Sequence, residues 1–553
     1  MKYHSGYQIA VIFSIMLFLS SLLLSPPGFC ESNDLEVGLS SEEAQKQEEV
    51  EEDIHGGTES EAAPAPVDRF VPMAIEPPQP DVLKFTDQGI RYYKGQGVEK
   101  DFQKAHDLFL KAAEKGGAAA QYILGYMYEH GQGVEKDLDR ALEWYQKAAE
   151  HEHVLGEYSY AYMLYYGQSG EKRPAEAAEW YKQAANHEDA LPIHHYSLGA
   201  IYDSDTGGVP PEFEKAAEWY ERAAKEGYGQ AQHSIAGMYY KGEGVPQDYW
   251  QALSWYKKAD SQGVVQSTYC IGLIYYNGDG IPKDYDKAVE YFQKAADRDF
   301  PPAIYSLAVM YETGDGVTKN PKRALVLYEK SAAAGFGDAM YRIGMMHLNG
   351  SLGKSEDASK AIEWFQKAVD NGSFEAAHAL GIAHEDGIGG FEANYLKAFE
   401  WYLYAAEGGH KEAQARVGVF FDNGLGVERD LKAAAKWHQK AAAQGVEYSQ
   451  MRYAGMCYNG MGVERDFEQA FKWYEAAARN GNIEAQYSVG VMHFNGQGAI
   501  QNDVKAYAWL SIAAVQGKDI AADQRNLVAS RMSAAEKNAG EELFNELYQE
   551  ILL

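Results

Sequence analysis

The sequence predicts an all-α protein in which helix-turn-helix repeats stack into an α/α solenoid. The first observation is a segment that recurs along the 553 residues, as DLDRALEWYQKAAE at 137–150, DASKAIEWFQKAVD at 357–370 and DFEQAFKWYEAAAR at 466–479. The second is its regular spacing, and the third is an apolar pattern with the period of a helix. A repeat of this length describes one supersecondary unit, which buries its apolar face only against the next copy.

Twelve copies of this segment align on one large residue, and consecutive copies are 36 to 39 residues apart. Alanine stands three positions earlier in every copy, and the positions at +1, +4 and +5 complete one stripe of a helix. We expect the aligned residue to fill the space that the small residues leave between neighbouring helices. The aligned residues are Leu108, Trp144, Trp180, Trp219, Trp255, Tyr291, Leu327, Trp364, Trp401, Trp437, Trp473 and Trp509.

The recurring segment carries its own start and stop signals. Seven residues before the aligned position, ten copies have Asp or Asn, which can accept hydrogen bonds from the free N–H groups of a first helical turn. Glycine stands eight residues after it in nine copies, as is typical of a helix C-terminus. Copies three and four have Arg173 and Glu212 in place of the cap, several prolines and the longest spacing, so we expect a longer connection between about 185 and 215.

The other half of each repeat predicts a second type of helix, as in AQYILGYMYEHGQGV at 120–134. Its middle position is Gly or Ala in all twelve copies, which indicates a close contact between helices. The G-x-G-V that follows indicates a turn rather than a phosphate-binding loop, since no strand precedes it. Each repeat is therefore predicted to be a hairpin, with the Gly or Ala in its first helix and the aligned residue in its second.

Two segments precede the repeats. Residues 1–30 have one lysine, an apolar run and then Pro26-Pro27, which predicts a signal peptide; because the run is long, a membrane anchor at 7–25 is the alternative. Residues 31–80 have 14 acidic side chains against Lys46 and Arg69, together with prolines, and predict a disordered acidic linker. We expect an exported protein, periplasmic or extracellular, that touches a membrane only if its N-terminal segment stays uncleaved.

The stretch AQYILGYMYEHGQGVEKDLDRALEWYQKAAE at 120–150 resembles the Sel-1-like repeat, a unit related to the tetratricopeptide (TPR) repeat. The resemblance covers 81–517 in twelve copies, and the tail at 518–553 resembles the capping helices of bacterial members. It implies a right-handed TPR-like superhelix and adaptor or scaffold roles in exported, membrane-associated or host-interacting proteins. A subgroup that binds or hydrolyses β-lactams has a cysteine pair in each repeat, which this chain, with three cysteines in all, does not match.

Tyrosines recur on the first helices, and they are the candidate partner-binding residues. In a TPR-like solenoid the first helices line the concave groove, where tyrosine offers a partner protein or peptide a large contact area with a polar tip. The alternative is that these side chains only pack between adjacent helices. The candidates are Tyr122, Tyr126, Tyr158, Tyr162, Tyr165, Tyr196, Tyr269, Tyr276, Tyr305 and Tyr341.

The remaining observations favour a monomeric, non-enzymatic scaffold without a cofactor or metal. The net charge of −31 argues against nucleic-acid binding, which needs a basic surface to neutralise phosphates. No arrangement of Ser, His, Asp or Cys has a catalytic spacing. Histidines gather near helix ends of repeats two to four, where we expect them to be solvated rather than to bind metal, and three more lie at a core-facing position of the first helix. They are His151, His153, His187, His194 and His195, and then His347, His384 and His493.

Two other functions stay open from the sequence. A cell-wall or carbohydrate-binding protein, or a hydrolase, could use the same groove by pairing Tyr305 with Glu312 and Tyr196 with Asp203. An adaptor in protein quality control in a secretory compartment would share the same repeats.

Overall fold

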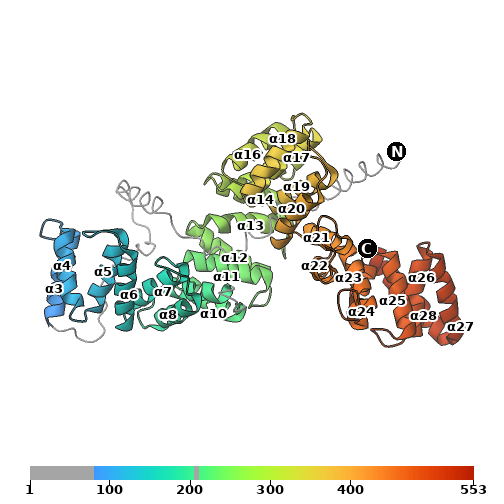
Figure 1. Ribbon diagram of the computed structural model, residues 1–553, viewed down its shortest axis with the longest axis horizontal. Helices are drawn as coiled ribbons and strands as arrows, with labels where there is room; N and C mark the ends of the chain where they lie inside the picture. The colour runs from blue at the N-terminus through green and yellow to red at the C-terminus, as the bar shows by residue number, and fades with distance from the viewer. Residues whose placement is uncertain (1–79, 205–210, 553) are drawn as a thin grey trace. The chain divides into compact units, whose positions relative to one another are not determined.

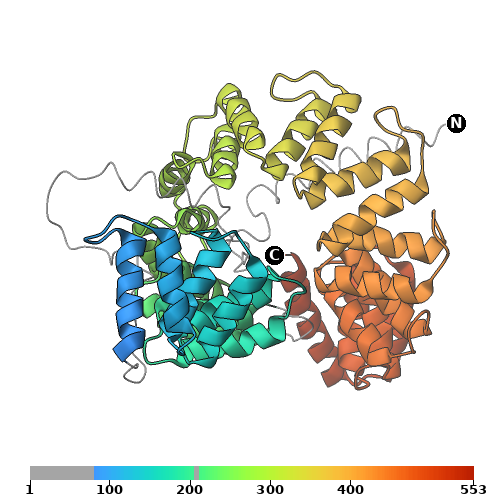
Figure 2. The same ribbon diagram turned by 60° about the vertical axis from the view of Figure 1, so that its left-hand side comes forward.

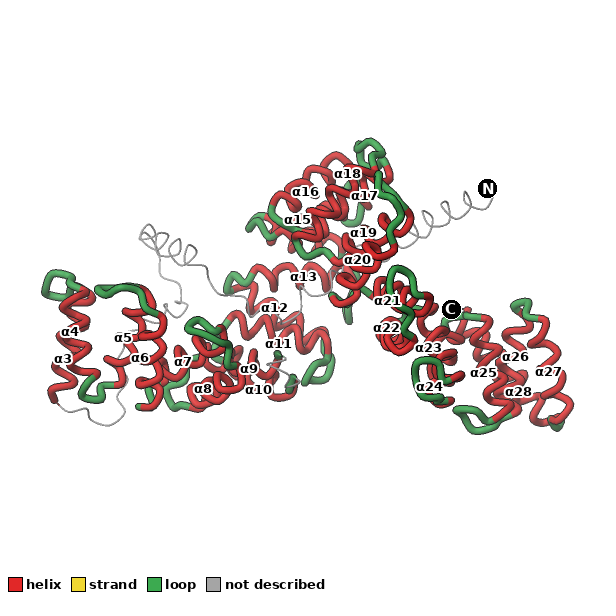
Figure 3. The backbone as a smooth tube through the Cα atoms, viewed as in Figure 1, coloured by secondary structure: helices red, strands yellow, loops and turns green. Residues whose placement is uncertain are grey.

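The computed structural model describes residues 80–204 and 211–552, and within these ranges every regular element is a helix (Figure 3). This confirms the predicted all-α class. The predicted signal peptide and nearly all of the acidic linker lie outside the described residues. None of the helices described here is both long and apolar enough to cross a lipid bilayer.

The helices α3 to α26 form the twelve predicted hairpins (Figure 1). The first helices are α3 (Pro80–Lys94), α5 (Ala118–His130), α7 (Val154–Tyr166), α9 (Pro192–Asp203), α11 (Gly229–Lys241), α13 (Val265–Asn277), α15 (Pro301–Thr313), α17 (Gly337–Asn349), α19 (Phe374–Asp386), α21 (Lys411–Asn423), α23 (Glu447–Asn459) and α25 (Ile483–Asn495). The second helices are α4 (Phe102–Ala113), α6 (Leu138–Glu150), α8 (Pro174–Asn186), α10 (Phe213–Lys225), α12 (Tyr249–Ser261), α14 (Tyr285–Ala296), α16 (Pro321–Ala333), α18 (Ala358–Asp370), α20 (Tyr395–Glu407), α22 (Leu431–Ala443), α24 (Phe467–Arg479) and α26 (Asp503–Val515).

The hairpins belong to two compact units, and the division falls within α15. The first unit runs to Ser306 and includes Asp315–Thr318, while the second contains Leu307–Gly314 and the chain from Lys319 onward. Inside each unit the second helix of one hairpin packs against the first helix of the next, so consecutive hairpins lie side by side along the chain (Figures 1 and 2). This stacking is the solenoid that the repeat predicts.

The predicted start and stop signals are confirmed. In each of the ten repeats with Asp or Asn at the cap, that side chain accepts a hydrogen bond from a backbone N–H of the first turn; Arg173 and Glu212 make no such bond. At the C-terminal stop, the nine glycines have positive φ, and Glu152 and Asp299 take φ values of 56° and 54° at the same position. Eleven of the twelve repeats therefore have a left-handed residue there, two of them without glycine, and Glu188 of repeat three is the exception.

The longer connection expected after repeat three is also observed. Residues 187–191 join α8 to α9, whereas 151–153 are enough to join α6 to α7. Part of the next connection, 205–210, lies outside the described residues.

The core contact of a hairpin joins the middle of its first helix to a ring in its second helix, or to Leu510 in the last hairpin. A Cβ atom placed on Gly125 would lie 2.6 Å from Cδ1 of Tyr145, and one on Gly344 would lie 2.6 Å from Cε1 of Phe365. Both rings are almost fully buried. The close contact predicted at the Gly or Ala position is therefore confirmed, because only a small residue leaves room for the ring.

The ring that fills this space is not the aligned residue but the one that follows it. Tyr145 is 1% exposed, whereas its neighbour Trp144 is half-buried with Lys147 lying 4.1 Å from the centroid of its ring. The expectation for the aligned residue is wrong in all repeats except those of Trp255 and Trp509, which are buried, because helical residues advance by about 100° each. The +1 position therefore lies at the centre of the alanine stripe, and the aligned position lies at its edge.

Glutamine side chains fasten one hairpin to the next. In five first helices a glutamine donates its Nε2 hydrogen to the backbone carbonyl eight residues earlier, which belongs to the second helix of the preceding hairpin. The N···O distances are 3.1 to 3.4 Å. The bonds are Gln121 to Ala113, Gln232 to Ala224, Gln414 to Ala406, Gln450 to Ala442 and Gln486 to Ala478.

Two further helices follow the last hairpin. Both α27 (Asp519–Arg531) and α28 (Ala534–Leu552) pack against α26. The apolar side of α28 carries Leu547 and Phe544 into the cluster that contains Trp509, which is 2% exposed. In this last repeat α28 thus covers the tryptophan that most other repeats leave half-buried.

Substitutions at two adjacent residues of α18 can show which of the two rings stabilises the hairpin. We expect Phe365→Ala to lower the free energy of unfolding of its hairpin by about 3–5 kcal/mol, because it empties a fully packed site. Trp364→Ala should cost only about 1 kcal/mol, since it removes a half-buried ring and its contact with Lys367. Hydrogen exchange of α17 and α18 amides measures both; equal losses would contradict this assignment of the core.

Candidate functional site

The tyrosines that stand three residues before the middle position act as packing between successive hairpins. The ring centroids of Tyr122, Tyr158, Tyr196, Tyr269 and Tyr341 lie 5.5–5.7 Å from the buried ring of their own hairpin. Several also touch a ring from the start of the next first helix, as Tyr122 stacks on His153 at 5.2 Å and Tyr269 meets Phe300 at 5.5 Å.

Two of the candidate partner-binding tyrosines are buried, and for them the prediction is wrong. Tyr122 is 5% exposed and Tyr269 is 0% exposed, so neither offers a surface to a partner. The reason is that the next hairpin covers each ring from the other side. Tyr158, Tyr196, Tyr305 and Tyr341 remain half-buried, with part of each side chain at the surface.

Tyrosines near the end of a first helix bond to the turn of the next repeat. The hydroxyl of Tyr276 donates to Asp315 Oδ2 at 3.3 Å, as Tyr240 does to Asp279 at 2.7 Å and Tyr458 to Gln497 at 3.2 Å. Burial is the main cause that raises the pKa of Tyr276. The hydroxyl of this candidate residue is thus used inside the solenoid.

Four of the other candidates gather with Tyr166 on α7 and α9 in what we call the tyrosine cluster: Tyr158, Tyr162, Tyr165, Tyr166 and Tyr196. Tyr166 lies at its centre, with ring centroids 4.6 Å from Tyr162 and 5.1 Å from Tyr165. Burial, and then the neighbouring tyrosines, raise the pKa of Tyr166 to about 12. All five side chains are half-buried, so the cluster keeps accessible surface. The candidate Tyr126, also half-buried, stacks on His130 in α5 at 4.0 Å.

Tyr166 is not among the tyrosines predicted from the sequence, although the sequence holds a signal for it. Tyr166 lies four residues after Tyr162, which places both on one side of α7. Tyr228, which comes directly before α11 and lies 5.2 Å from Tyr196, is not among them either. Only the contact between hairpins shows the second residue, because 32 positions separate the two in the chain.

Three of the five histidines near helix ends, His153, His194 and His195, are buried, which corrects the expectation that they are solvated; His151 is exposed, as expected, and His187 is half-buried. His153 accepts a hydrogen bond from Gly156 N at 3.2 Å, and His194 accepts one from Leu191 N at 3.0 Å. Burial lowers the pKa of His153 to about 4 and that of His194 to about 3. Over the described ranges, no three His, Cys, Asp or Glu side chains are arranged to hold a metal ion. The three histidines expected in the core, His347, His384 and His493, are buried there.

Glu157 takes the place of the glutamine that fastens one hairpin to the next, since it follows Gln121 by one repeat length. It is 4% exposed, and in the described part of the chain its Oε2 atom has no hydrogen-bond partner. Burial, and then the charge of Glu152, raise the pKa of Glu157 to about 7. A protonated carboxyl can donate a hydrogen bond as the glutamine amide does, whereas a carboxylate cannot.

The carboxylates that a carbohydrate site would use already have partners. Glu312 accepts hydrogen bonds from the Tyr328 hydroxyl at 2.7 Å and from Arg342. Asp203 accepts one from the Tyr220 hydroxyl at 3.1 Å. Neither of these two residues is therefore left for a sugar in the arrangement that the sequence suggested.

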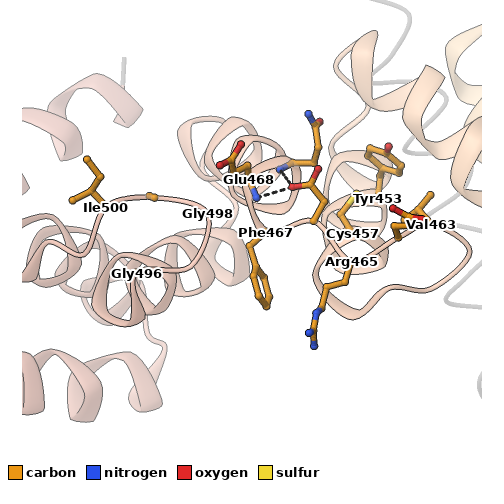
Figure 4. A pocket seen from close by; sticks show the side chains of 13 residues that line it. Tyr453, Cys457, Val463, Arg465, Phe467, Glu468, Gly496, Gly498 and Ile500 are labelled. Carbon is orange, nitrogen blue, oxygen red and sulfur yellow. Dashed lines mark hydrogen bonds between the residues drawn. The ribbon is translucent and has the colours of Figure 1, made fainter.

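A surface pocket of about 850 Å³ lies between the turns of the last two repeats (Figure 4). Its lining includes Cys457, Asp466 and the turn glycines Gly496 and Gly498. Asp466 accepts from the backbone N–H groups of Glu468 and Gln469 at 2.9 and 3.0 Å, so its carboxylate is the cap of α24. Burial raises the pKa of the Cys457 thiol, which disfavours a reactive thiolate.

Short helical hairpins that stack through buried rings, glutamine bonds and capped ends define an α/α repeat solenoid. The chain belongs to the Sel1 repeat family, as the resemblance in its sequence implies. The family model, Sel1 repeat, matches twelve consecutive segments at 89–117, 118–153, 154–189, 195–228, 229–264, 267–300, 301–336, 337–373, 374–410, 411–446, 447–482 and 483–518. Sel1 repeat proteins generally act as protein-interaction scaffolds.

Three of the solved structures that are similar to this chain come from bacteria. The protective antigen c5321 of uropathogenic Escherichia coli, described as displaying an SLR fold, is 30% identical over 81% of this chain and 95% of its own, with a TM-score of 0.43. A Sel1 repeat protein from Oxalobacter formigenes is 31% identical over 44% of this chain and 98% of its own, with a TM-score of 0.38. Immunity protein Pa5087 from Pseudomonas aeruginosa is 21% identical over 41% and 86%, with a TM-score of 0.25. No match was found among curated protein sequences.

The substitution Glu157→Gln should stabilise the hairpin of α7 and α8 at high pH. The folded-state pKa of Glu157, about 7, is above its usual value of 4.5, so its contribution to stability is complete below about pH 4.5 and is lost as the pH rises through 7. We therefore expect the variant to exceed the wild type in free energy of unfolding at pH 8, with a difference that shrinks toward pH 4.5. Urea denaturation across this range measures the difference.

The lowered pKa values of His153 and His194 act with the opposite sign, because their contribution is lost as the pH falls below about 6.5. Both histidines are present in the wild type and in the variant, so their effect cancels in the difference between the two. Gln121→Glu is the reciprocal control, because it places a glutamate where another repeat has glutamine. The free energy of unfolding of this variant should fall as the pH rises, as that of the wild type does through Glu157. A difference between wild type and Glu157→Gln that does not change with pH would contradict the assignment.

Proposed function

We propose that the protein is a non-enzymatic scaffold that holds a segment of a partner protein on the tyrosine cluster and the adjoining side of α5. The single observation that carries this proposal is that Tyr162 and Tyr166 pack on each other within one helix and remain half-buried. Tyr122 and Tyr269, in contrast, are covered by the next hairpin. Tyrosine rings grouped at a surface are favourable anchors, because they bury a large area and lose little conformational entropy.

We also propose that the protein is exported from the cytoplasm. A lysine, a long apolar run and a proline pair within residues 1–30 support export to the periplasm or the outside of the cell. Residues 31–80 would then separate the repeats from the point of processing or anchoring. The repeats work as a monomer in this proposal, since one solenoid carries the whole surface.

Removing two surface rings should abolish partner capture without unfolding the chain. A binding segment is first selected on the wild-type protein from a displayed peptide library. Tyr126→Ser combined with Tyr162→Ser should then weaken its binding by about tenfold or more, since each lost aromatic anchor costs on the order of 1–2 kcal/mol. Fluorescence anisotropy measures the affinity, and circular dichroism checks the helical content.

The matched control removes two exposed tyrosines elsewhere, Tyr395→Ser with Tyr448→Ser, at 46% and 55% exposure. This control should bind as the wild type does. Equal weakening in both double variants would count against the tyrosine cluster as the site. Hydrogen-exchange protection by the peptide should also centre on α5, α7 and α9.

Export can be tested on the protein recovered from expressing cells. If residues 1–30 are a cleaved signal peptide, mass spectrometry of the exported protein should find a mature N-terminus near Glu31. Retention of residues 7–25 in a membrane fraction would instead support the anchored form.

A further inference from the structure

Five first helices carry a carboxylate one turn after their middle position, and four of these accept a hydrogen bond from the tyrosine of the core contact. The tyrosine oxygen lies 2.6 to 3.1 Å from the carboxylate oxygen in those four hairpins. The five residues are Glu129, Asp203, Glu312, Glu385 and Asp422. The carboxylate is thus held in place by its own hairpin, with part of its hydrogen-bonding capacity left over.

In three cases an arginine from the next first helix uses that remaining capacity. Arg342 donates to Glu312, Arg416 to Glu385, and Arg452 Nη2 to Asp422 Oδ1 at 2.6 Å. Each arginine stands 30 or 31 residues after its carboxylate, two positions before the middle of its helix. The Arg416 guanidinium also lies 5.8 Å from the ring centroid of Tyr402, so it contacts both a carboxylate and an aromatic face.

Glu129 has the same surroundings without the arginine. Its Oε2 accepts from the Tyr145 hydroxyl at 2.6 Å, but the position that would hold the arginine is occupied by Ser159. Within the described ranges its Oε1 has no hydrogen-bond partner, and the nearest basic atom is His130 Nδ1, 4.0 Å from Oε2. Its side chain is 24% exposed.

The open carboxylate borders the tyrosine cluster. The helices that carry the two residues, α5 and α7, are in contact, and the charge of Glu129 contributes, after burial, to the raised pKa of Tyr162. Tyr126 lies one helical turn before Glu129 on the same helix. A cation placed on Glu129 would therefore have aromatic rings beside it, as Arg416 has Tyr402.

We infer that the partner segment supplies an arginine that docks on Glu129, in the place that Arg342, Arg416 and Arg452 fill in other repeats. This inference rests on the proposed function and specifies the chemistry of the partner, a basic segment of a protein. A guanidinium makes two parallel hydrogen bonds to a carboxylate and stacks on aromatic rings, whereas a lysine ammonium does neither as well. The net charge of −31 also favours the approach of a basic segment.

The test uses the full-length protein and a displayed library of random 12-residue peptides. Binders selected on the wild type are sequenced and scored for arginine against lysine. Their affinities are then measured for Glu129→Gln, which keeps an acceptor for Tyr145, and for Ser159→Arg, which places an internal arginine on Glu129. Ser488→Arg is the matched control, because Ser488 holds the same position in α25 and the corresponding carboxylate position of the preceding first helix is Tyr458.

We expect binders enriched in arginine and a loss of about tenfold or more in affinity for Glu129→Gln and Ser159→Arg, since a charge-assisted hydrogen bond is lost or already taken. Ser488→Arg should bind as the wild type does. Ser159→Arg should also resist urea at least as well as the wild type, which separates occupation of the site from unfolding.

Enrichment of lysine equal to that of arginine, or unchanged affinity in both site variants, would overturn the inference. If such binders still lose affinity when Tyr126 and Tyr162 are replaced, the proposed function stands without it. If no selected peptide depends on the tyrosine cluster either, both proposals fail.

Discussion

The hairpins depend on one contact, between the small residue in the middle of the first helix and the side chain that follows the aligned residue of the second helix, which is a ring in all repeats but the last, where it is Leu510. The size of the residue in the first helix limits how closely the two helices can approach. A Cβ atom placed on Gly125, Gly344 or Gly418 would lie less than 3 Å from the ring opposite it, which is Tyr145, Phe365 or His438 respectively. This contact fixes the distance between the two helices. Tyrosines of the first helix pack on that ring, as Tyr122 does on Tyr145. Where the ring is a tyrosine, its hydroxyl can donate to a carboxylate one turn after the small residue, as Tyr145 does to Glu129. The candidate site is therefore built on the same contact.

Much of the fold could be predicted because its signals are local. The caps of the second helices, the glycine stops and the small middle residue each depend on residues close in the sequence, and all were correctly assigned. The aligned tryptophan was wrongly assigned because it is the most prominent letter of the repeat but stands at the edge of the buried stripe. Trp144 therefore packs under Lys147 at the surface, and Tyr145 takes the interior.

The candidate site could be predicted only in part, because its exposure depends on the neighbouring hairpin. Tyr122 and Tyr126 are the same residue type on the same helix, yet His153 from the next hairpin covers only the first. Glu129 and Glu385 likewise occupy one position, and they differ because residue 159 is serine while residue 416 is arginine. Departures from the repeat concentrate in the same region: Glu157 replaces a glutamine, Arg173 replaces a cap, and the connection before α9 is longer. Local rules fail most often where a surface has been specialised.

The cover that α28 provides over Trp509 gives the C-terminal end of the array a different property from its middle. Interior hairpins offer nearly the same faces to their neighbours, so an unequal crossover between two copies of the coding sequence would add or delete one whole hairpin and keep every remaining interface complete. A deletion that reached α28 would instead uncover Trp509 and the apolar surface around it. Members of a lineage that descends from such a chain would therefore vary in repeat number while keeping the same last helices.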